Sequence, residues 1–566
     1  MQKTGLKQEK LRVAMAQINC LVGDLQGNFA KIRGNIEKAR SLGADIVVFP
    51  ELAITGYPPE DLLLKPEFIS DNLEYLKKLV KLSGDMLVIV GFVDRKSGRL
   101  YNSLAVIYSG KIVGVYHKMR LPNYGVFDEE RYFEAGEAPP VYKFGKSVFG
   151  LSICEDIWHR DGPIKMQADQ GAKLIFNSNA SPYHAGKINE REEIVRKQAR
   201  LNKAAIVYVN LVGGQDELVF DGQSIVVDDQ GRVIERAGAF KEDLLVVDLA
   251  VPFSKGRGLK KSITVAGKIT PKKKLALAGK KIKPLAPLAE IYQALLLGLG
   301  DYIRKNGFKK VVVGLSGGID SAIVAVLAAD AIGSGNVTGV FMPSRYSSNA
   351  SRVDAGGLAK NLGIKFVTIP IERMYRAYLE ELAPHLSGLK ANIAEENLQA
   401  RIRGNILMAL SNKFGWLVLT TGNKSEMSTG YATLYGDMAG GFAVIKDVPK
   451  TLVYKLAAYR NSLGAVIPGR IFTKEPTAEL RPGQKDSDSL PVYGVLDPIL
   501  KAYIEEDKGL GEIASLGFEP KAVSQVLSMV DKSEYKRRQS PPGIKITPKS
   551  FGKDRRMPIT NKYVVK

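Results

Sequence analysis

One stretch restricts the possible folds of this chain more than any other, and it reads VVVGLSGGIDSAIVAVLAADAIG over residues 311–333. The β-branched run predicts a buried strand, the apolar segment from residue 321 predicts a helix, and the glycines between them predict a tight turn. Further strand-type runs cover residues 337–342, 365–371 and 416–423, and a helical segment covers residues 397–415. This alternation predicts an α/β domain with a doubly wound parallel sheet.

The N-terminal half is richer in predicted strands. Its strand-type runs cover residues 11–20, 44–52, 85–94, 102–118, 147–156, 172–181, 204–214 and 223–229. Helical patterns occupy 35–43 and 191–204. This half is therefore expected to place helices around a largely β interior.

A basic stretch, SKGRGLKKSITVAGKITPKKKLALAGKKIKP, separates the halves at residues 254–284. Much of the formal net charge of +22 lies there and in the tail from residue 534. Such charge suits nucleic acid, an anionic membrane surface or acidic small substrates, but these two segments favour a solvated linker and a solvated tail. We expect a first domain over 1–253, a basic linker over 254–284 and a second domain over 285–566.

The chain has no sign of membrane insertion or export. No run approaches the ~18 apolar residues of a membrane helix, and the first twenty residues lack an apolar core of signal-peptide length. We expect a cytoplasmic protein without a membrane partner. Its two cysteines, Cys20 and Cys154, exclude a disulfide framework or a zinc site of several thiolates. A cysteine with a chemical role would therefore act alone.

Three reactive side chains stand where predicted strands end: Glu51, Lys118 and Cys154. A cysteine attacks an amide as a thiolate, and a neighbouring lysine lowers its pKa and stabilises the developing oxyanion. A glutamate accepts the thiol proton and returns it to the departing ammonia. Taken singly, such a cysteine is more commonly a core residue, and such charged residues are more commonly solvated.

The surrounding sequence resembles the nitrilase superfamily. PELAITGYPPEDLL, YHKMRLPNYGVFDEERYF and ICEDIW match its three signature segments in order and in approximate spacing. The resemblance implies an αββα sandwich. The catalytic set that it implies is Glu51, Lys118 and Cys154. The glutamine-binding residues that it implies are Tyr124, Glu129, Ser181 and Lys187.

The turn LSGGIDSA is not a kinase or GTPase loop, because Ile319 and Asp320 stand where such a loop has its lysine. Gly317 and Gly318 let backbone N–H groups face an anion, beside the positive end of the following helix. Asp320 would repel a bare phosphate, so a magnesium ion is expected between them. The string S-G-G-x-D-S resembles the ATP pyrophosphatase loop. The expected ATP-binding residues are Gly314, Leu315, Ser316, Gly317, Gly318, Ile319, Asp320 and Ser321.

Two later segments resemble parts of NAD synthetases. Residues 392–451 resemble their nucleotide-binding core, and AELRPGQKDSDSLPVYGVLD resembles their mobile substrate-covering loop. The resemblance adds Thr421 to the ATP site. It implies deamido-NAD contacts by Asn397, Glu426 and Lys536, and magnesium contacts by Asp320 and Glu426. Arg401 and Arg403 fit either an exposed helix face or a contact with the dinucleotide phosphates.

Taken whole, the chain resembles glutamine-dependent NAD synthetases. The implied reaction adenylates the carboxylate of deamido-NAD with ATP and displaces AMP with ammonia from glutamine. An internal passage would keep that ammonia unprotonated and protect the adenylate from water. The expected partners are deamido-NAD, ATP, glutamine and a second copy of the chain in a homo-oligomer, with magnesium as cofactor and no nucleic acid.

Three alternatives remain at the level of sequence. A tRNA-modifying ATP pyrophosphatase would use the positive charge on RNA, with steep salt dependence, but the C-terminal half lacks the paired cysteines of the sulfur-transferring members. Another glutamine amidotransferase would adenylate a different substrate. A binding protein on degenerate enzyme domains would fail to bind ATP and magnesium.

Overall fold

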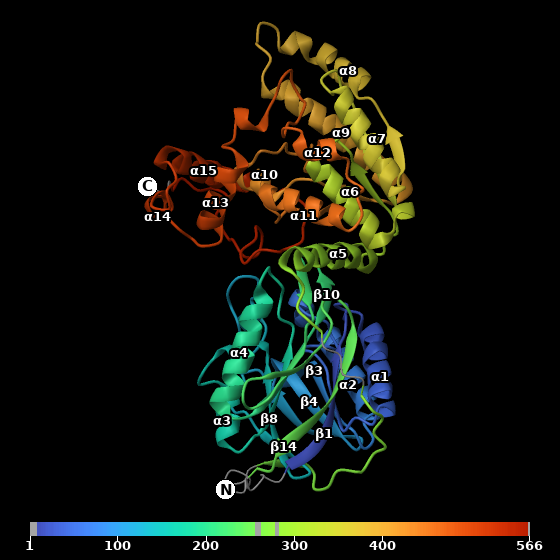
Figure 1. Cartoon of the computed structure of the whole chain (residues 1–566), viewed down its shortest axis with the longest axis vertical. Helices are drawn as coiled ribbons and strands as arrows, with labels where there is room; N and C mark the ends of the chain where they lie inside the picture. The colour runs from blue at the N-terminus through green and yellow to red at the C-terminus, as the bar shows by residue number, and fades with distance from the viewer. Residues whose placement is uncertain (1–7, 255–261, 278–281, 564–566) are drawn as a thin grey trace. The chain divides into compact units, whose positions relative to one another are not determined.

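The computed structural model describes residues 8–254, 262–277 and 282–563, and the chain divides into two compact units (Figure 1). The first comprises residues 1–215 and 219–285, and the second comprises 216–218 and 286–566. Parts of the expected N-terminal segment, linker and tail, at 1–7, 255–261, 278–281 and 564–566, lie outside the described residues. Within the described ranges, no helix has the length and apolar character needed to cross a membrane.

The first unit is built on two mixed β-sheets. One has the strand order β14-β1-β2-β3-β4-β5 and the other has the order β13-β12-β9-β8-β7-β6-β15. The strands of the first sheet are β1 Gln8–Gln17, β2 Ile46–Val48, β3 Leu87–Lys96, β4 Arg99–Tyr108, β5 Lys111–His117 and β14 Asp243–Pro252. The strands of the second sheet are β6 Val141–Phe144, β7 Ser147–Ile153, β8 Leu174–Asn179, β9 Ala205–Asn210, β12 Ile225–Val227, β13 Val233–Arg236 and β15 Ile263–Ala266. A separate hairpin pairs β10 Val212–Gln215 with β11 Leu218–Asp221.

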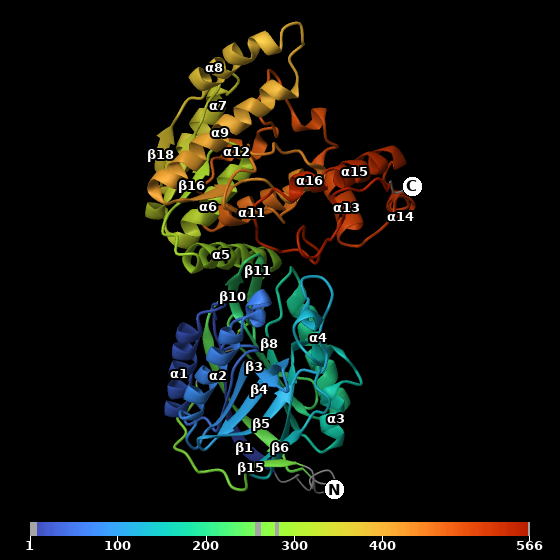
Figure 2. The ribbon, with the colours of Figure 1, turned by 180° about the vertical axis from the view of Figure 1, so that it is seen from behind.

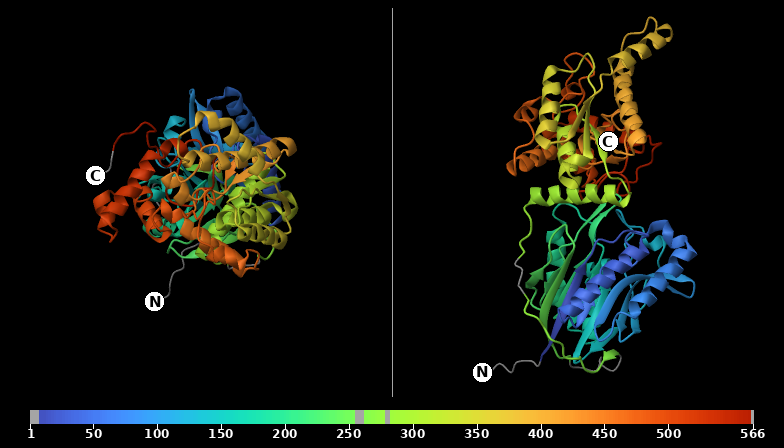
Figure 3. Two further views of the ribbon diagram at one scale, coloured as in Figure 1. Left: turned by 90° about the horizontal axis from the view of Figure 1, so that it is seen from above. Right: turned by 90° about the vertical axis from the view of Figure 1, so that its right-hand side faces the viewer.

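The two sheets enclose one apolar core. Side chains from both sheets meet there, including Val13 and Val48 from one and Leu151 and Phe176 from the other. Helices α1 (Leu25–Ser41) and α2 (Pro66–Val80) cover the first sheet, and α3 (Pro163–Asp169) and α4 (Lys187–Asn202) cover the second (Figures 1 and 2). Figure 3 shows these layers from two further sides. The predicted αββα sandwich is confirmed.

The first and last strands of the first sheet pair along their whole length. β1 runs antiparallel to β14, from Gln8 opposite Pro252 to Gln17 opposite Asp243. The register is reinforced by an ion pair across the strands, in which the Arg12 guanidinium lies 2.7 Å from the Asp248 carboxylate. Two strands that are far apart in the sequence are therefore neighbours in the sheet, and β14 forms one of its edges.

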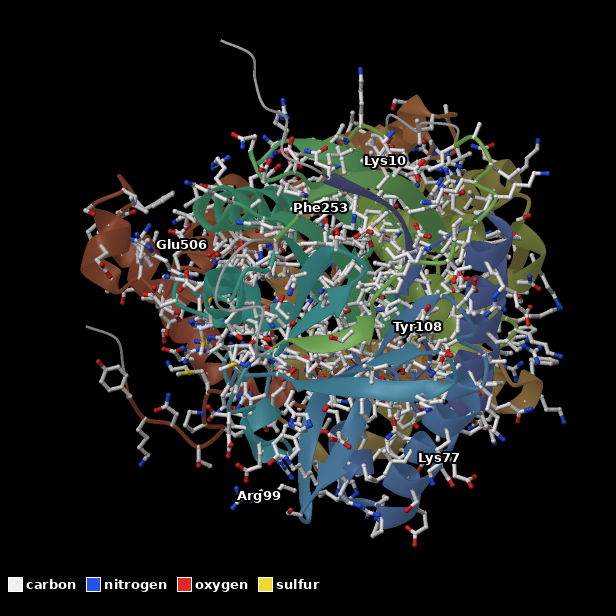
Figure 4. The ribbon with its side chains drawn as sticks, turned by 90° about the horizontal axis from the view of Figure 1, so that it is seen from below. Lys10, Lys77, Arg99, Tyr108, Phe253 and Glu506 are labelled. Carbon is white, nitrogen blue, oxygen red and sulfur yellow. The ribbon has the colours of Figure 1, made fainter. Side chains whose placement is uncertain are left out.

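Two details differ from the sequence-based expectations. The run at 102–118 forms two strands, β4 and β5, because the chain turns at Ser109 and Gly110, which have φ of 50° and 70°. Tyr108, labelled in Figure 4 at the end of β4, packs edge-on against Phe144 with ring centroids 5.6 Å apart. The segment expected to be a solvated linker contains β15, which pairs in parallel with β6.

The second unit is built on a parallel sheet with the order β18-β17-β16-β19-β20. Its strands are β16 Val311–Gly314, β17 Val337–Phe341, β18 Lys365–Thr368, β19 Leu417–Thr420 and β20 Phe442–Ala443. On one face, Val312 packs with residues of α8 (Glu372–Leu382) and α9 (Ile393–Phe414). On the other, α6 (Ile319–Ile332) contacts β16 and β17, and α5 (Pro287–Lys305) and α11 (Lys450–Ser462) pack on α6 (Figure 2). The predicted doubly wound sheet is confirmed.

The remaining helices surround this sheet and form a small C-terminal cluster. They are α7 Asn349–Leu362, α10 Lys424–Thr429, α12 Gly469–Thr473, α13 Tyr493–Ile504, α14 Leu510–Ala514, α15 Pro520–Lys532 and α16 Glu534–Arg537. The prediction of a solvated tail is wrong for parts of the stretch between Arg537 and Arg555. Both of these residues and Lys545 are buried, because carboxylates pair with them: Lys545 lies 2.5 Å from Asp554.

Two candidate active sites

Cys154 lies at the sharp turn that follows β7. The strand is buried throughout, and the chain passes directly into a 3-10 helix, η3 (Cys154–Trp158). Cys154 has a φ of 40°, in the left-handed region that residues other than glycine seldom adopt. Backbone strain of this kind is found where a side chain must be aimed, and here it aims a buried thiol from the carboxyl end of the sheet.

Lys118 follows β5, and its ammonium lies between two carboxylates. Its Nζ donates hydrogen bonds to Oε1 of Glu51 at 2.7 Å and to Oε1 of Glu129 at 2.9 Å. The Tyr57 hydroxyl donates to the same oxygen of Glu129 at 2.9 Å. All four residues are buried. The structure therefore brings three of the predicted residues into one dry, charge-paired cluster.

Glu51 is held on both of its carboxylate oxygens. Besides Lys118, the amide of Asn102 donates to Oε1 at 2.7 Å, and the backbone N–H of Ala180 donates to Oε2 at 2.8 Å. Asn102 belongs to β4 and Ala180 follows β8, so both sheets of the sandwich orient this carboxylate. A base that is fixed in this way has one orientation toward its proton donor.

The charges of this cluster act on the Cys154 thiol. Burial raises the pKa of Cys154 well above its usual value, Glu51 raises it further, and Lys118 lowers it. Lys118 lowers the pKa of Cys154 as the sequence predicts, but burial and Glu51 outweigh the lysine. The thiol is therefore protonated at neutral pH and requires a base at the moment of attack. Burial also raises the pKa of Glu129 to about 7, against the attraction of Lys118.

The other predicted glutamine-binding residues lie around this cluster. The Tyr124 hydroxyl donates to Glu155, the residue after Cys154, at 2.8 Å. Ser181 directly follows the residue whose N–H donates to the Glu51 carboxylate. Lys187 lies at the start of α4, with its ammonium 4.5 Å from the centre of the Trp158 ring. Tyr124 and Lys187 thus contact the ends of η3.

The second candidate site begins at the turn between β16 and α6. Gly317 has a φ of 77°, and a Cβ atom at this position would lie 2.5 Å from the carbonyl oxygen of Ser351. The Ser316 N–H donates to the Ser321 hydroxyl, and the Gly318 N–H donates to the Ser316 hydroxyl, both at 3.2 Å. The turn therefore depends on glycine for its shape and on two serines for its stability.

Asp320 and Glu426 share the ammonium of Lys450. Nζ donates to Asp320 at 2.5 Å and lies 3.6 Å from the Glu426 carboxylate. The Asn423 amide donates to Asp320 at 3.0 Å, and its oxygen accepts the Glu426 N–H at the start of α10. Burial and Asp320 raise the pKa of Glu426 to about 8. The structure thus brings the two predicted metal carboxylates together.

This donor set fits a magnesium ion that binds with a nucleotide. Magnesium usually takes one or two carboxylates, with phosphate oxygens and water as its remaining ligands. Among the described residues, no group of three or more His, Cys, Asp or Glu side chains could hold a metal ion. Asp320 and Glu426 would supply the protein ligands of such a site.

A cavity of about 280 Å³ lies beside the turn. The predicted residues that line it are Gly314, Leu315, Ser316, Gly318, Ile319, Asp320, Ser321, Thr421 and Glu426. Gly317 is not among the lining residues. It shapes the turn from behind instead, against Ser351.

Asn397 and Lys536 do not line this cavity. Both contact the segment that follows α10, which forms part of its wall through Tyr431 and Thr433. The Thr433 hydroxyl donates to Asn397 at 2.7 Å, and Lys536 Nζ donates to the Gly430 carbonyl at 2.8 Å. The structure therefore places these two residues behind the wall.

The sequence does not identify several of the residues that line the cavity, and it leaves the role of Arg403 undecided. Arg403 lines the cavity, and burial lowers its pKa to about 10, whereas Arg401 is exposed. Lys450 also lines it, but nothing distinguishes this lysine from a solvated one in the sequence. The residues from Lys474 to Leu480 line it as well. Residues 474–477 have no signal in the sequence, and for residues 478–480 the only signal is the resemblance of residues 478–497 to a covering loop.

Comparisons with known proteins match a different family to each of the two units of the chain. The carbon-nitrogen hydrolase family matches residues 12–253, and the NAD synthase family matches residues 291–540. The chain is 50% identical to a glutamine-dependent NAD(+) synthetase of Thermotoga maritima, over 98% of this chain and 99% of the relative. It is 49% identical to one of Aquifex aeolicus, over 98% of this chain and 100% of the relative.

Solved structures show the same similarity. A glutamine-dependent NAD+ synthetase from Acinetobacter baumannii in complex with ADP is 42% identical, with a TM-score of 0.75 over 98% of this chain and 99% of that one. A glutamine-dependent NAD(+) synthetase from Cytophaga hutchinsonii shares the fold, with a TM-score of 0.82 at 23% identity over 98% of both chains.

Proposed function

Because the chain belongs to the glutamine-dependent NAD(+) synthetases, we propose that its first unit releases ammonia from glutamine and its second unit consumes it. The enzyme catalyses the ATP-dependent amidation of deamido-NAD to NAD, with AMP, pyrophosphate and glutamate as the other products. The observation that carries this function is the presence, in one chain, of a buried Glu-Lys-Cys cluster and a glycine turn beside a cavity. The full-length similarity favours it over the tRNA-modifying and other amidotransferase alternatives.

The glutaminase step uses the cluster around Cys154. Glu51 accepts the thiol proton as sulfur bonds to the amide carbon of glutamine, and the C–N bond then breaks as the proton passes to ammonia. Lys118 stabilises the negative charge that forms on the amide oxygen. Water then attacks the thioester with Glu51 as base, which releases glutamate and restores the thiol. Tyr124, Glu129, Ser181 and Lys187 are proposed to bind glutamine.

The synthetase step uses the turn and the cavity. The residues from Gly314 to Ser321 are proposed to hold the phosphates of ATP, and Thr421 is proposed to contact ATP. Asn397, Glu426 and Lys536 are proposed to contact deamido-NAD. The nicotinate carboxylate attacks the α-phosphorus, pyrophosphate leaves, and ammonia then displaces AMP from the adenylate. Asp320 and Glu426 would hold a magnesium ion, whose charge would offset that of the phosphates.

The functional domains are proposed to be a glutaminase over 1–253 and a synthetase over 285–566, joined by 254–284. The internal ammonia passage, the homo-oligomeric assembly and the cytoplasmic location stay predictions of the sequence. Each follows from the resemblance or the composition described above.

The test is NAD formation from deamido-NAD, ATP and magnesium, with either glutamine or ammonium as nitrogen donor. The wild type is expected to use both donors, and Cys154→Ala is expected to use ammonium alone. If the variant still uses glutamine, the glutaminase assignment fails. If neither protein makes NAD from ammonium, the synthetase assignment fails.

A further inference from the structure

Asp156 accepts four hydrogen bonds in the interior of the first unit. Its Oδ2 accepts the Tyr116 hydroxyl at 2.7 Å and the Ile153 N–H at 2.8 Å. Its Oδ1 accepts the N–H groups of Met119 at 3.2 Å and Arg120 at 2.9 Å. Its side chain is fully buried. One carboxylate therefore satisfies three backbone donors and one hydroxyl, and the bonds from Tyr116 and Ile153 are buried.

These donors flank two of the proposed catalytic residues. Ile153 directly precedes Cys154, and Met119 and Arg120 directly follow Lys118. Cys154 follows β7 of the second sheet, and Lys118 follows β5 of the first. Asp156 therefore joins the ends of two strands that belong to different sheets, at the place where each carries a reactive side chain.

The bond to Ile153 also bears on the strained turn. Cys154 has a left-handed backbone between β7 and η3. Asp156, two residues after Cys154, accepts the N–H of Ile153, the residue just before Cys154. Such a bond closes the turn around the cysteine and holds the thiol in one direction.

We propose that Asp156 is a positioning residue for the glutaminase reaction. It fixes the thiol of Cys154 relative to the ammonium of Lys118 across the two sheets, without contacting glutamine itself. The inference rests on the proposed glutaminase function. It predicts that loss of this carboxylate lowers the rate of the chemical step and leaves glutamine binding unchanged, because none of the four donors is a proposed glutamine ligand.

The test compares Asp156→Asn with the wild type in the full-length enzyme. Asparagine has the same shape, but its NH₂ group faces two of these donors, so the hydrogen bonds on one side of the carboxylate are lost. We expect kcat for glutamine-driven NAD formation to fall about 10²-fold, the usual cost of a displacement near 1 Å, with KM for glutamine within threefold. Ammonium-driven NAD formation should stay within twofold.

Two further variants separate positioning from folding. Asp45→Asn changes another buried carboxylate of the same unit, which accepts the Arg12 N–H at 2.7 Å and lies before β2, and should leave both activities within twofold. Tyr116→Phe removes one of the four donors to Asp156, the Tyr116 hydroxyl. It should lower the glutamine-driven kcat about 3- to 10-fold at constant KM, and it keeps the test informative if Asp156→Asn does not fold.

The outcomes are distinguishable from those for the proposed function. If Cys154→Ala abolishes glutamine use while Asp156→Asn and Tyr116→Phe keep a wild-type kcat, the positioning role is overturned and the glutaminase stands. A rise in KM for glutamine at constant kcat in Asp156→Asn also overturns it. If Cys154→Ala keeps glutamine use, the glutaminase function fails first.

Discussion

The two candidate sites are built in opposite ways. In the first, the buried carboxylates of Glu51 and Glu129 each accept a hydrogen bond from the Lys118 ammonium, and donors from both sheets fix Glu51. In the second, a cavity of about 280 Å³ is lined by a glycine turn and by the residues from Lys474 to Leu480, and its carboxylates share one ammonium. A site that acts on a single amide can be closed around it, whereas a site for two nucleotides must leave room. In the first site, substitutions of the bonded side chains should therefore have the largest effects on activity. In the second site, changes in backbone conformation should also lower activity.

The largest effect is expected from the base of the first site. Glu51→Gln removes the proton acceptor for a thiol that is protonated at neutral pH, so glutamine-driven NAD formation should fall about 10³-fold. Ammonium-driven NAD formation, measured in parallel, should stay within twofold. An equal loss of activity with both nitrogen donors would contradict the contrast between the two sites, because it would mean that the Glu51 carboxylate serves both of them.

The next effect is expected from the second site. Asp320→Asn removes a carboxylate next to the glycine turn between β16 and α6, and NAD formation should fall about 10²-fold with glutamine and with ammonium alike. Asp330→Asn is the matched control, because Asp330 lies on the same helix but pairs with Arg460 instead. The control should keep both activities within threefold. A loss restricted to glutamine in Asp320→Asn would contradict the assignment.

A methyl group should be enough to disturb the second site. Gly317→Ala places a Cβ atom 2.5 Å from the Ser351 carbonyl in a left-handed backbone, so the turn must shift. KM for ATP should rise about tenfold with either nitrogen donor, the order of a strain of 1–3 kcal/mol. Gly335→Ala, just beyond the same helix, meets nothing within 4 Å and should leave KM unchanged. Equal behaviour of the two variants would show that backbone shape is not limiting.

The smallest effect has the opposite sign and sharpens the contrast. Glu51 raises the pKa of Cys154, so Glu51→Gln should lower that pKa and increase the thiolate fraction near neutral pH. Alkylation of Cys154 by iodoacetamide at pH 7.5 should accelerate about 3- to 10-fold, although turnover is lost. Cys154→Ala gives the background from Cys20. A slower reaction in Glu51→Gln would mean that Glu51 activates the resting thiol instead.

Local pattern predicted the strand ends but not the contacts between them. Glu51, Lys118 and Cys154 each follow a visible apolar run, so their places at strand ends could be read directly. Their convergence depends on the order of strands in two sheets, which hydrophobic periodicity does not encode. Asp156 was missed for the same reason, because its partners come from β5 and β7 and their flanks.

Charge-rich segments were the weakest part of the prediction. Lys545 and Arg555 stand in a basic tail that composition assigns to solvent, yet both are buried beside carboxylates. Lys450 looks like a surface lysine in sequence but lies between Asp320 and Glu426. Composition counts charges one at a time, and burial depends on whether each finds a partner in the folded chain.

The pairing of β1 with β14 sets the order in which the first unit can mature on the ribosome. β1 and its antiparallel partner lie far apart in the sequence, so β1 is synthesised well before β14, which ends at residue 252. Until then, one side of a ten-residue strand is an open edge, of the kind that templates aggregation. A pause in translation before β14 would therefore be more hazardous to this protein than one after it.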